Sequence, residues 1–358
     1  MSEFDGLDPK LIEQLAGLDE EEAWRLIYEK ANDPAVFCES FIKIVNRRGK
    51  LVPLEFNYPQ LLLNNTLARL EKEGKPKWLI ILKSRREGVS TWSEARIFER
   101  VLREENHSGI VIAHKAKAST KLFRMTRRFY DHLPWKPDLV YSNRTELEFA
   151  APHSSVMEIE SAEDREAGRS AEYHYVHASE VAFWPDAETT MLAILQTVPN
   201  DPETMVLLES TANGAGGYFY DTWMGAINGQ NEFTPVFLPW HIDGECAMAL
   251  EPDEQDKIEA TLDEEETEGI KRWGWTWEQI KWRRFTLRNK CKNDLDMFRQ
   301  EYPATDLEAF RSSGRPVFSQ KIVGELIDAL RTGKTETQRG TLVTLAAEAD
   351  TVATQNDA

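Results

Sequence analysis

Short apolar runs alternate with helical patterns through the first two thirds of the chain. The runs are rich in β-branched and aromatic residues, as strands are, and they occupy residues 78–82, 109–114, 145–150, 156–160, 172–178, 204–210 and 236–241. Between them, residues 90–105 and 117–133 repeat apolar side chains at helical spacing. This alternation predicts an α/β fold with a mainly parallel, doubly wound sheet flanked by helices. In such a sheet the ligand binds at the carboxyl ends of the strands.

The pattern changes on both sides of this core. Residues 1–50 are acidic and helical in pattern, residues 51–242 hold the α/β core, and the strand pattern stops after residue 241. Residues 243–330 predict a small helical subdomain, and the polar tail at 331–358 is expected to be flexible. We expect the core of the helical subdomain, rather than a platform for stacking bases, to be formed by Trp273, Trp275, Trp277 and Trp282.

Composition predicts a globular, cytosolic protein. Of the 358 residues, 41% are hydrophobic and 29% are charged, which excludes a disordered chain. No apolar run approaches the ~20 residues of a membrane span, and the N-terminus lacks the basic and apolar regions of a signal peptide. The three cysteines, Cys38, Cys246 and Cys291, lack metal-ligand spacing, so we expect buried thiols and no zinc site. No membrane partner is expected.

Charge is unevenly distributed along the chain. Asp and Glu outnumber Lys and Arg by 61 to 43, a net charge of −18, which taken alone argues against nucleic acid as a partner. Residues 1–30 and 243–270 hold nearly all of this excess acid, whereas residues 114–128 carry bases without an acid and residues 271–300 are also rich in bases. A run of bases is a solvated helix face about as often as it is a binding surface. Any contact with DNA is therefore expected to be local, weak and salt-sensitive.

The first predicted strand leads into ILKSRREGVSTW, which opens a helix. A phosphate-binding loop has this position, because its backbone N–H groups and the helix N-terminus face an anion. Against the pattern GxxxxGK[ST], Gly88 and Ser90 match, whereas Lys83 stands at the first glycine and Val89 at the lysine. On pattern alone an ordinary strand-to-helix turn is the simpler interpretation. The chemistry is satisfied if Lys83 reaches the phosphates from the end of the strand.

Four further segments accompany this loop in order. They are PLEFNYPQ (53–60) upstream, and GRSAEYHYVHASEVAFW (168–184), LLESTANGAGGYFYDTW (207–223) and QEYPATDLEAFRSSGRPVF (300–318) downstream. Together with a loop lysine at the first position, they resemble the large terminase subunits of tailed bacteriophages, the ATPases that pump DNA into procapsids. Because the five matches occur in order, the resemblance is specific, whereas any one of them alone is not.

The resemblance implies a RecA/ASCE-like P-loop ATPase that uses ATP and Mg²⁺. Adenine would lie near Tyr58 and Gln60, and the phosphates would lie over Lys83, Ser84, Arg85, Arg86, Glu87, Gly88, Val89, Ser90 and Thr91. Ser90 and Ser179 would hold Mg²⁺, and Glu180 would be the catalytic base that orients the attacking water. A coupling segment would sense the γ-phosphate and shift the helical subdomain through Ser210, Thr211, Ala212 and Asn213.

Phosphoryl transfer also needs positive charge on the γ-phosphate oxygens, which an arginine finger supplies. Arg85 and Arg86 are the candidates within the chain, and the candidates across a subunit boundary are Arg124, Arg128, Arg165 and Arg169. The sequence does not choose among them. Near this site, His174 and His177 alternate on a predicted strand, and we expect them to pack in the core rather than to act in catalysis.

Two features depart from the family pattern. The family ends its second nucleotide motif with Asp-Glu, and here the pair is Ser179-Glu180, so a weaker metal affinity is expected. The family also carries a nuclease after the ATPase, which needs clustered acids at strand ends to hold two metal ions. After Phe318 only 40 residues remain, and Glu348, Asp350 and Asp357 lie there in a segment without strand-helix alternation. We therefore expect no nuclease activity from this chain.

These features predict the ATPase motor of a viral DNA-packaging terminase. The resemblance implies double-stranded DNA, a portal protein and a small terminase subunit as partners, in the host cytoplasm during virion assembly. It also implies a homo-oligomeric ring on the portal, and we expect a monomer in isolation. One alternative is a helicase-like, nucleic-acid-dependent ATPase, which needs a second lobe for which the chain after residue 241 is too short. The other is a catalytically weak nucleotide-binding module, which Val89 and Ser179 keep open.

Overall fold

The computed structural model describes residues 9–164, 167–168, 171–310 and 329. The chain divides into two compact units, Met1–Ser313 and Gly314–Ala358. All elements below belong to the first unit. The tail expected at residues 331–358, with Glu348, Asp350 and Asp357, lies outside the described residues, as do Arg165 and Arg169.

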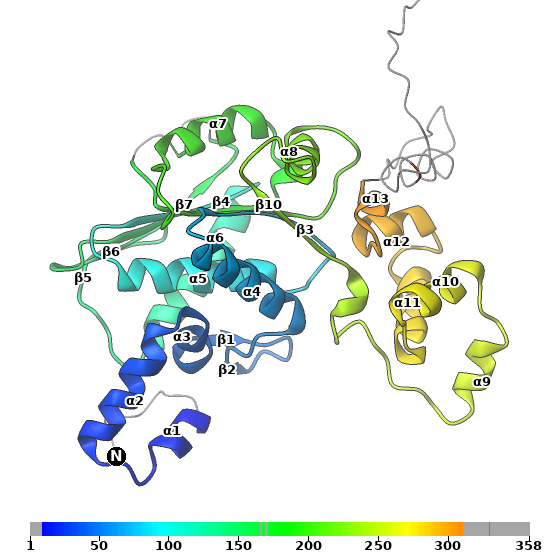
Figure 1. The fold of residues 1–358 in the computed structure, drawn as a ribbon, viewed down its shortest axis with the longest axis horizontal. Helices are drawn as coiled ribbons and strands as arrows, with labels where there is room; N and C mark the ends of the chain where they lie inside the picture. The colour runs from blue at the N-terminus through cyan, green and yellow to red at the C-terminus, as the bar shows by residue number, and fades with distance from the viewer. Residues whose placement is uncertain (1–8, 165–166, 169–170, 311–328, 330–358) are drawn as a thin grey trace, which may run out of the picture. The chain divides into compact units, whose positions relative to one another are not determined.

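An eight-stranded sheet forms the centre of the first unit (Figure 1). Its strands are β3 (Lys77–Lys83), β4 (Ser108–Ala113), β5 (Leu139–Ser142), β6 (Glu146–Phe149), β7 (Val156–Ser161), β8 (Tyr175–Ser179), β9 (Met205–Ser210) and β10 (Thr234–Leu238). The spatial order is β10-β3-β9-β8-β4-β7-β6-β5, parallel from β10 to β7 and antiparallel for the last two strands. The predicted α/β fold is confirmed. The edge strand β5 was not predicted because Val140 and Tyr141 are exposed and leave no apolar alternation.

Helices cover both faces of the sheet. Figure 1 shows α4 (Tyr58–Lys72), α5 (Val89–Arg103) and α6 (Ala116–Asp131) on one side and α7 (Ala187–Thr197) and α8 (Tyr218–Ile227) on the other. Side chains of a strand alternate between faces, so Leu79 and Ile81 pack with the α5 side whereas Ile80 and Leu82 pack with the α7 side. This burial on both faces explains why the strands read as continuous apolar runs.

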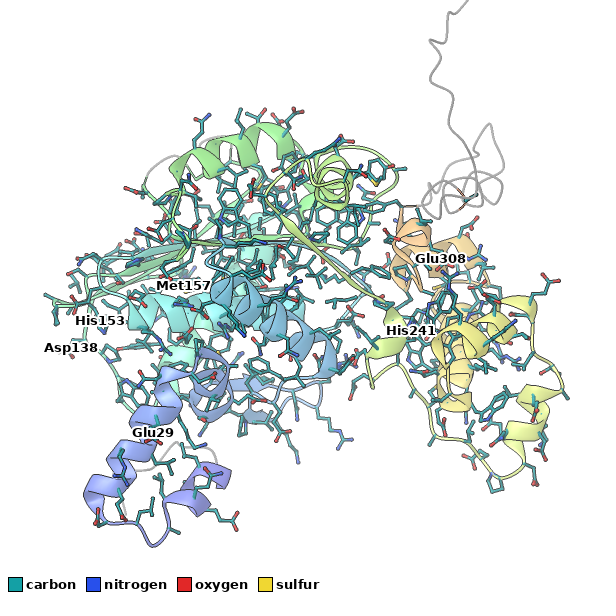
Figure 2. The ribbon with its side chains drawn as sticks, viewed as in Figure 1. Glu29, Asp138, His153, Met157, His241 and Glu308 are labelled. Atoms are coloured by element: carbon teal, nitrogen blue, oxygen red, sulfur yellow. The ribbon has the colours of Figure 1, made fainter. Side chains whose placement is uncertain are left out.

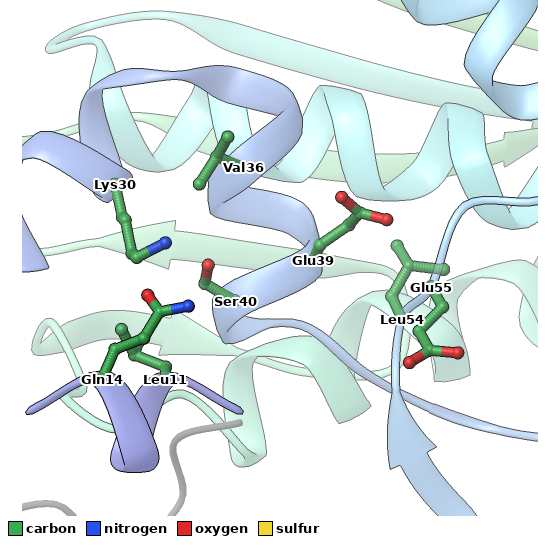
Figure 3. A pocket seen from close by; sticks show the side chains of 8 residues that line it. All are labelled: Leu11, Gln14, Lys30, Val36, Glu39, Ser40, Leu54 and Glu55. Carbon is green, nitrogen blue, oxygen red and sulfur yellow. The ribbon is translucent and has the colours of Figure 1, made fainter. Parts of the chain in front are cut away.

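Three N-terminal helices pack against the α5 side, namely α1 (Pro9–Leu15), α2 (Glu20–Asn32) and α3 (Pro34–Phe41). A hairpin of β1 (Lys43–Val45) and β2 (Leu51–Pro53) follows and leads to α4. A cavity of about 270 Å³ lies between this region's helices and the loop after β2, as Figure 3 shows from close by. Its lining includes Lys30, Glu39 and Ser40, and it contains no residue of the predicted phosphate loop.

A helical subdomain with its own core follows the last strand. It contains α9 (Glu254–Glu259), α10 (Glu264–Trp273), α11 (Trp277–Asn289), α12 (Leu295–Glu301) and α13 (Asp306–Ala309). Trp240 stacks on Trp282 with ring centroids 5.3 Å apart, and Trp275 packs beside them. The predicted tryptophan core is therefore confirmed, with Trp273 and Trp277 partly buried against it. His241 joins the same cluster (Figure 2), and burial lowers its pKa to about 4.

Part of the acidic run of this subdomain forms ion pairs with part of its basic run. Lys281 pairs with Glu254 at 2.6 Å, and buried Arg283 contacts Glu265 and Glu266. Two further ion pairs join the same runs, Arg284 to Glu266 and Arg299 to Glu265. These four bases are therefore bound by acids of the preceding run, and for the other bases of residues 271–300 a DNA-facing surface stays a prediction.

Two expectations about the chain as a whole can be compared with the structure. Cys38, Cys246 and Cys291 are free and buried, as predicted. None of the helices in the described part of the chain has the length and apolar character that crossing a membrane demands.

Candidate functional site

A tight loop joins β3 to α5 at the carboxyl edge of the sheet. Gly88 adopts a φ of 77° and is the last residue before the helix. A Cβ atom on Gly88 would lie 2.7 Å from Nε2 of Gln60, so both conformation and space require glycine here. The first N–H groups of α5 have no intrahelical partner and face out of the helix end. With the helix dipole they create a site for an anion, as a phosphate-binding loop requires.

The N-terminus of α4 holds this loop in place. Asn57 and Gln60 form a reciprocal capping box, in which the amide oxygen of each accepts a bond from the backbone N–H of the other. Their amide nitrogens donate to the loop, Asn57 to the carbonyl of Glu87 at 3.0 Å and Gln60 to the carbonyl of Gly88 at 2.9 Å. Both ends of the Gln60 amide are therefore engaged, and the segment resembling an adenine-recognition motif serves here as a brace for the loop.

Lys83 lies at the centre of the site. Its ammonium is 3.0 Å from Oε1 of Glu180, at the end of β8, and 3.1 Å from Oε2 of Glu209, on β9. Because β9 lies between β3 and β8 in the sheet, the carboxyl ends of the three strands adjoin. The structure thus brings Lys83 and Glu180 together, although 97 residues separate them. Glu180 adopts a φ of 56°, a conformation that a side-chain-bearing residue adopts only at a cost of about 1 kcal/mol or more.

Glu209 is the site residue that sequence analysis missed. It pairs in register with Ser179 on β8, and its Oε1 accepts bonds from Ser179 at 2.8 Å and from Ser90 at 2.7 Å. His177 also approaches Oε1, at 3.3 Å. The sequence MVLLES did contain a signal for Glu209. A glutamate within a strand that is buried on both faces cannot reach solvent, so a buried partner or ligand is expected.

Burial and charge act in opposite directions on these groups. Burial opposes charge on Lys83, but Glu209 and Glu180 outweigh it and raise the lysine pKa above its ordinary value. Burial likewise opposes charge on Glu209, yet Lys83 and His177 hold the pKa of that carboxyl well below its ordinary range. His177 is buried between Glu209 and Glu94, and hydrogen bonds to both outweigh burial and raise its pKa to about 9. The network is therefore ionised at neutral pH.

The predicted coupling segment adjoins this network. Oε2 of Glu180 lies 3.4 Å from the hydroxyl of Ser210 and from the backbone N–H of Thr211. Asn213 donates to the carbonyl of Ala182, just after Glu180. On the other side, Nε2 of Gln300 on α12 approaches the carbonyl of Ala212 at 3.5 Å. The segment therefore lies between the Glu180 carboxylate and the helical subdomain.

Other residues of the predicted loop have different surroundings. Ser84 is buried and bonds to the carbonyl of Leu238 on β10. Arg85 pairs with Glu301 on α12 at 2.6 Å, and its backbone N–H donates to the Glu301 carbonyl. Glu87 is buried, and burial raises its pKa well above the ordinary value. The side chain of Val89 packs in the core on the α5 side, so it does not face the loop.

A cavity of about 510 Å³ opens beside the loop, within the range of small-molecule sites. Its lining includes loop and brace residues, namely Asn57, Gln60, Arg86, Gly88 and Thr91. The turn between β1 and β2 adds Asn46, Arg47 and Arg48, which sequence analysis did not single out. Tyr58 is 57% exposed and does not line this cavity. The arrangement fits a phosphorylated ligand whose body lies between the turn and the helix N-terminus.

Oxygen ligands for a divalent cation gather at the same point. Among the residues that the structure describes, no group of three or more His, Cys, Asp or Glu could hold a metal. A magnesium ion bound together with a nucleotide needs fewer protein ligands, because phosphates and water supply the rest. The hydroxyls of Ser90 and Ser179, which share the carboxylate oxygen of Glu209, fit this chemistry.

Comparison with known proteins finds a distant likeness. No family model matches the sequence. The structure is similar to the large terminase ATPase domain of Thermus phage P74-26, at 15% identity and a TM-score of 0.45, over 69% of this chain and 92% of that one. It is also similar to the large terminase of bacteriophage HK97, at 12% identity and a TM-score of 0.49, over 70% of this chain and 55% of that one.

A third similar structure is the large terminase of a thermophilic bacteriophage in complex with ATP-gamma-S, at 11% identity and a TM-score of 0.42. That match covers 60% of this chain and 51% of the other. The chain thus spans about half the length of the HK97 protein and of the thermophilic phage protein. At these identities and scores the likeness concerns the fold, and the chemistry of this chain rests on its own residues.

Proposed function

We propose that this chain is the ATP-hydrolysing motor of a viral DNA-packaging terminase. The observation that carries the proposal is the meeting of Lys83 and Glu180, at 3.0 Å, beside the N-terminus of α5. A lysine at the end of one strand, an acid at the end of the next strand but one and a helix N-terminus preceded by glycine are parts that phosphoryl transfer from a nucleotide requires. The ordered motifs that resemble large terminases support a role in DNA packaging rather than in another ATP-driven process.

The two carboxylates beside Lys83, Glu180 and Glu209, have different roles. The side chain of Glu180 is 28% exposed, so it can reach a water molecule, whereas Glu209 is fully buried. A γ-phosphate at the loop competes for the Lys83 ammonium and releases Glu180 to accept a hydrogen bond from the attacking water. Bound Mg²⁺ neutralises phosphate charge. Glu180 is therefore the catalytic base and Lys83 the phosphate-binding cation.

The two loop arginines also differ in role. Arg86 lines the cavity, as do Arg47 and Arg48 of the β1–β2 turn, and it is the loop arginine whose charge faces the ligand. Arg85 is engaged with Glu301 on α12, so it links the loop to the helical subdomain. Loss of the γ-phosphate alters the contacts of Glu180, and Ser210 and Thr211 transmit that change towards Gln300. The proposal divides the chain into four parts. They are an N-terminal helical segment at residues 1–50, the ATPase core at 51–242, the helical subdomain at 243–330 and a tail at 331–358.

Double-stranded DNA is the polymer that the proposed motor translocates. The exposed bases of α6 are its proposed contact surface, and in the second basic stretch Lys281, Arg283, Arg284 and Arg299 are already paired with acids. A portal protein and a small terminase subunit are the proposed protein partners, with a ring of this chain assembled on the portal.

Phosphate release with Mg²⁺ and DNA tests the enzyme directly. We expect turnover by the parent, and losses of about 10²-fold or more for Lys83→Ala and Glu180→Gln, because each removes a group that acts on the transferred phosphate. Glu188→Gln, at an exposed position on α7, is the matched control and should retain parental turnover. A parent that releases no phosphate at high protein concentration, or a fully active Glu180→Gln, contradicts the proposal.

A further inference from the structure

The metal position at the end of β8 lacks a charge. Ser179 occupies the place where a carboxylate is expected, and a hydroxyl is a weak ligand for Mg²⁺, which prefers carboxylates and phosphates. The neighbouring strand supplies what β8 lacks. Glu209 on β9 lies in register with Ser179, and the period-two alternation of strands turns both side chains towards α5.

The carboxylate of Glu209 is fully buried and aimed at the phosphate loop. Its Oε1 accepts bonds from Ser90 and Ser179, at 2.7 and 2.8 Å. Its Oε2 has no hydrogen-bond partner among the described residues and faces the Lys83 ammonium at 3.1 Å. The loop hydroxyl that binds metal in a P-loop site is therefore already bonded to this carboxylate.

A counter-ion role alone does not account for this arrangement. Lys83 has a second acid, Glu180, at 3.0 Å, and His177 has a second acid, Glu94, at 2.8 Å. Burying a further carboxylate costs several kcal/mol unless its attractions repay the cost. Glu209 nevertheless lies fully buried against the loop, where its Oε1 accepts the hydrogen bond of Ser90.

We propose that Glu209 supplies the carboxylate of the magnesium site, displaced by one strand from its expected position at Ser179. The assignment rests on the proposed function. Ser90 donates its hydrogen to Glu209, which leaves the lone pairs of its oxygen free for a cation. Ser179 is then a positioning residue, since its hydroxyl holds Oε1 of Glu209 in place.

Nucleotide affinity with and without magnesium tests this assignment. The quantity measured is the ratio of the dissociation constants for ATP in EDTA and in Mg²⁺. Removal of a mere counter-ion frees Lys83 and raises the affinity equally in both buffers, so the ratio stays unchanged. Removal of a metal ligand lowers the ratio. We expect Glu209→Gln to lower it by about tenfold or more.

Glu94→Gln is the matched control. Glu94 is as buried as Glu209 and bonds to the other nitrogen of His177, but it does not touch the loop hydroxyl. This variant should lose thermal stability and keep the parental magnesium ratio. The double variant Ser179→Asp/Glu209→Gln, which returns the carboxylate to β8, should recover most of the ratio. Electron spin resonance of free Mn²⁺ during titration with ADP and protein should give the same ranking.

Three results overturn the assignment. They are a Glu209→Gln ratio within twofold of the parent, an equal loss in Glu94→Gln, and a parent that binds ATP equally well in both buffers. If Glu209→Gln does not fold, Glu209→Asp replaces it, since it keeps the charge and withdraws it by one methylene; an unchanged ratio then also overturns the assignment. A parent that binds no ATP at all removes the proposed function itself, which separates the two failures.

Discussion

Glu87 shows how a single loop residue can depart from the role that its position implies. It stands in the phosphate loop, yet its side chain is 1% exposed, and the nearby Asp243 is buried as well. Burial and the charge of Asp243 raise its pKa well above the ordinary value, against the opposing effect of Lys83. A buried carboxyl of this kind is a cost to the folded state at neutral pH rather than a phosphate contact.

We expect Glu87→Gln to stabilise the protein at pH 8 by on the order of 1 to 2 kcal/mol, or a few degrees in Tm. With a raised pKa, the folded state binds the proton more tightly than the unfolded chain. The stability that this contributes is complete below about pH 4.5 and is lost as the pH rises through the folded pKa. The Tm difference between variant and parent should therefore grow with pH. Exposed Glu188→Gln is the control, and a difference independent of pH would count against this account.

Residues also mark where sequence reasoning ends. Lys83 and Ser90 were singled out because a strand, a glycine and a helix in sequence constrain where they lie, and Glu180 was singled out through the resemblance of residues 168–184 to a family motif. Glu209 was missed because its role depends on strand order: β9 inserts between β3 and β8, and a single sequence does not state that neighbourhood. Val89 was placed among the phosphate contacts because a loop pattern assigns positions, not directions, and its side chain turns into the core.

At the scale of elements, two capping boxes of the same chemistry serve different ends. Gln60 caps α4 and donates to the carbonyl of Gly88 in the loop. Gln279 caps α11 and donates to the carbonyl of His241 in the helical subdomain, at 2.6 Å. Equivalent substitutions of Gln60 and Gln279 can therefore be compared. The comparison distinguishes the loss of stability that follows any lost hydrogen-bond donor from a specific effect on the nucleotide site.

Gln60→Glu keeps the capping acceptor but replaces the donor with a carboxylate that repels the Gly88 carbonyl. We expect both Gln60→Glu and Gln279→Glu to lower Tm, because each leaves a carbonyl unsatisfied. Only Gln60→Glu should weaken ATP binding, by about tenfold, which corresponds to ~1.4 kcal/mol. Titration calorimetry on both variants decides the matter, and an equal loss of affinity would show that the brace has no specific role.

The elements themselves were predictable where local pattern and burial agree. Seven apolar runs became strands, of which β3, β4, β8 and β9 are buried on both faces and β6 and β7 bury alternate residues, and α5 and α6 kept their helical spacing. Strand β5 and the β1–β2 hairpin escaped because their side chains are partly or fully exposed and carry no apolar period. The ion pairs between the acidic run and α11 were not predicted for another reason. A run of charged residues in a sequence does not show which residues it contacts in the fold.

At the scale of the whole molecule, the net charge of −18 is a poor guide to what the surface can bind. Three acids of the run after the last strand, Glu254, Glu265 and Glu266, pair with Lys281, Arg283, Arg284 and Arg299. On α6, by contrast, Lys117, Lys121 and Arg124 are exposed, and none of them forms an ion pair with a described residue. Their spacing of four and three places them on one face of the helix, and residues 114–128 contain no acid.

If this face of α6 contacts DNA, as proposed, then Lys121→Glu/Arg124→Glu should weaken binding and make the dependence of log affinity on log salt shallower by about one to two, because each lost phosphate contact removes roughly one released counterion. The matched control is Arg69→Glu/Lys72→Glu on α4, which reverses two exposed bases at the same spacing and changes the net charge equally. Fluorescence anisotropy over a salt series measures both. Equal losses in the two variants would mean that DNA responds only to overall charge, and α6 would then not be the contact surface.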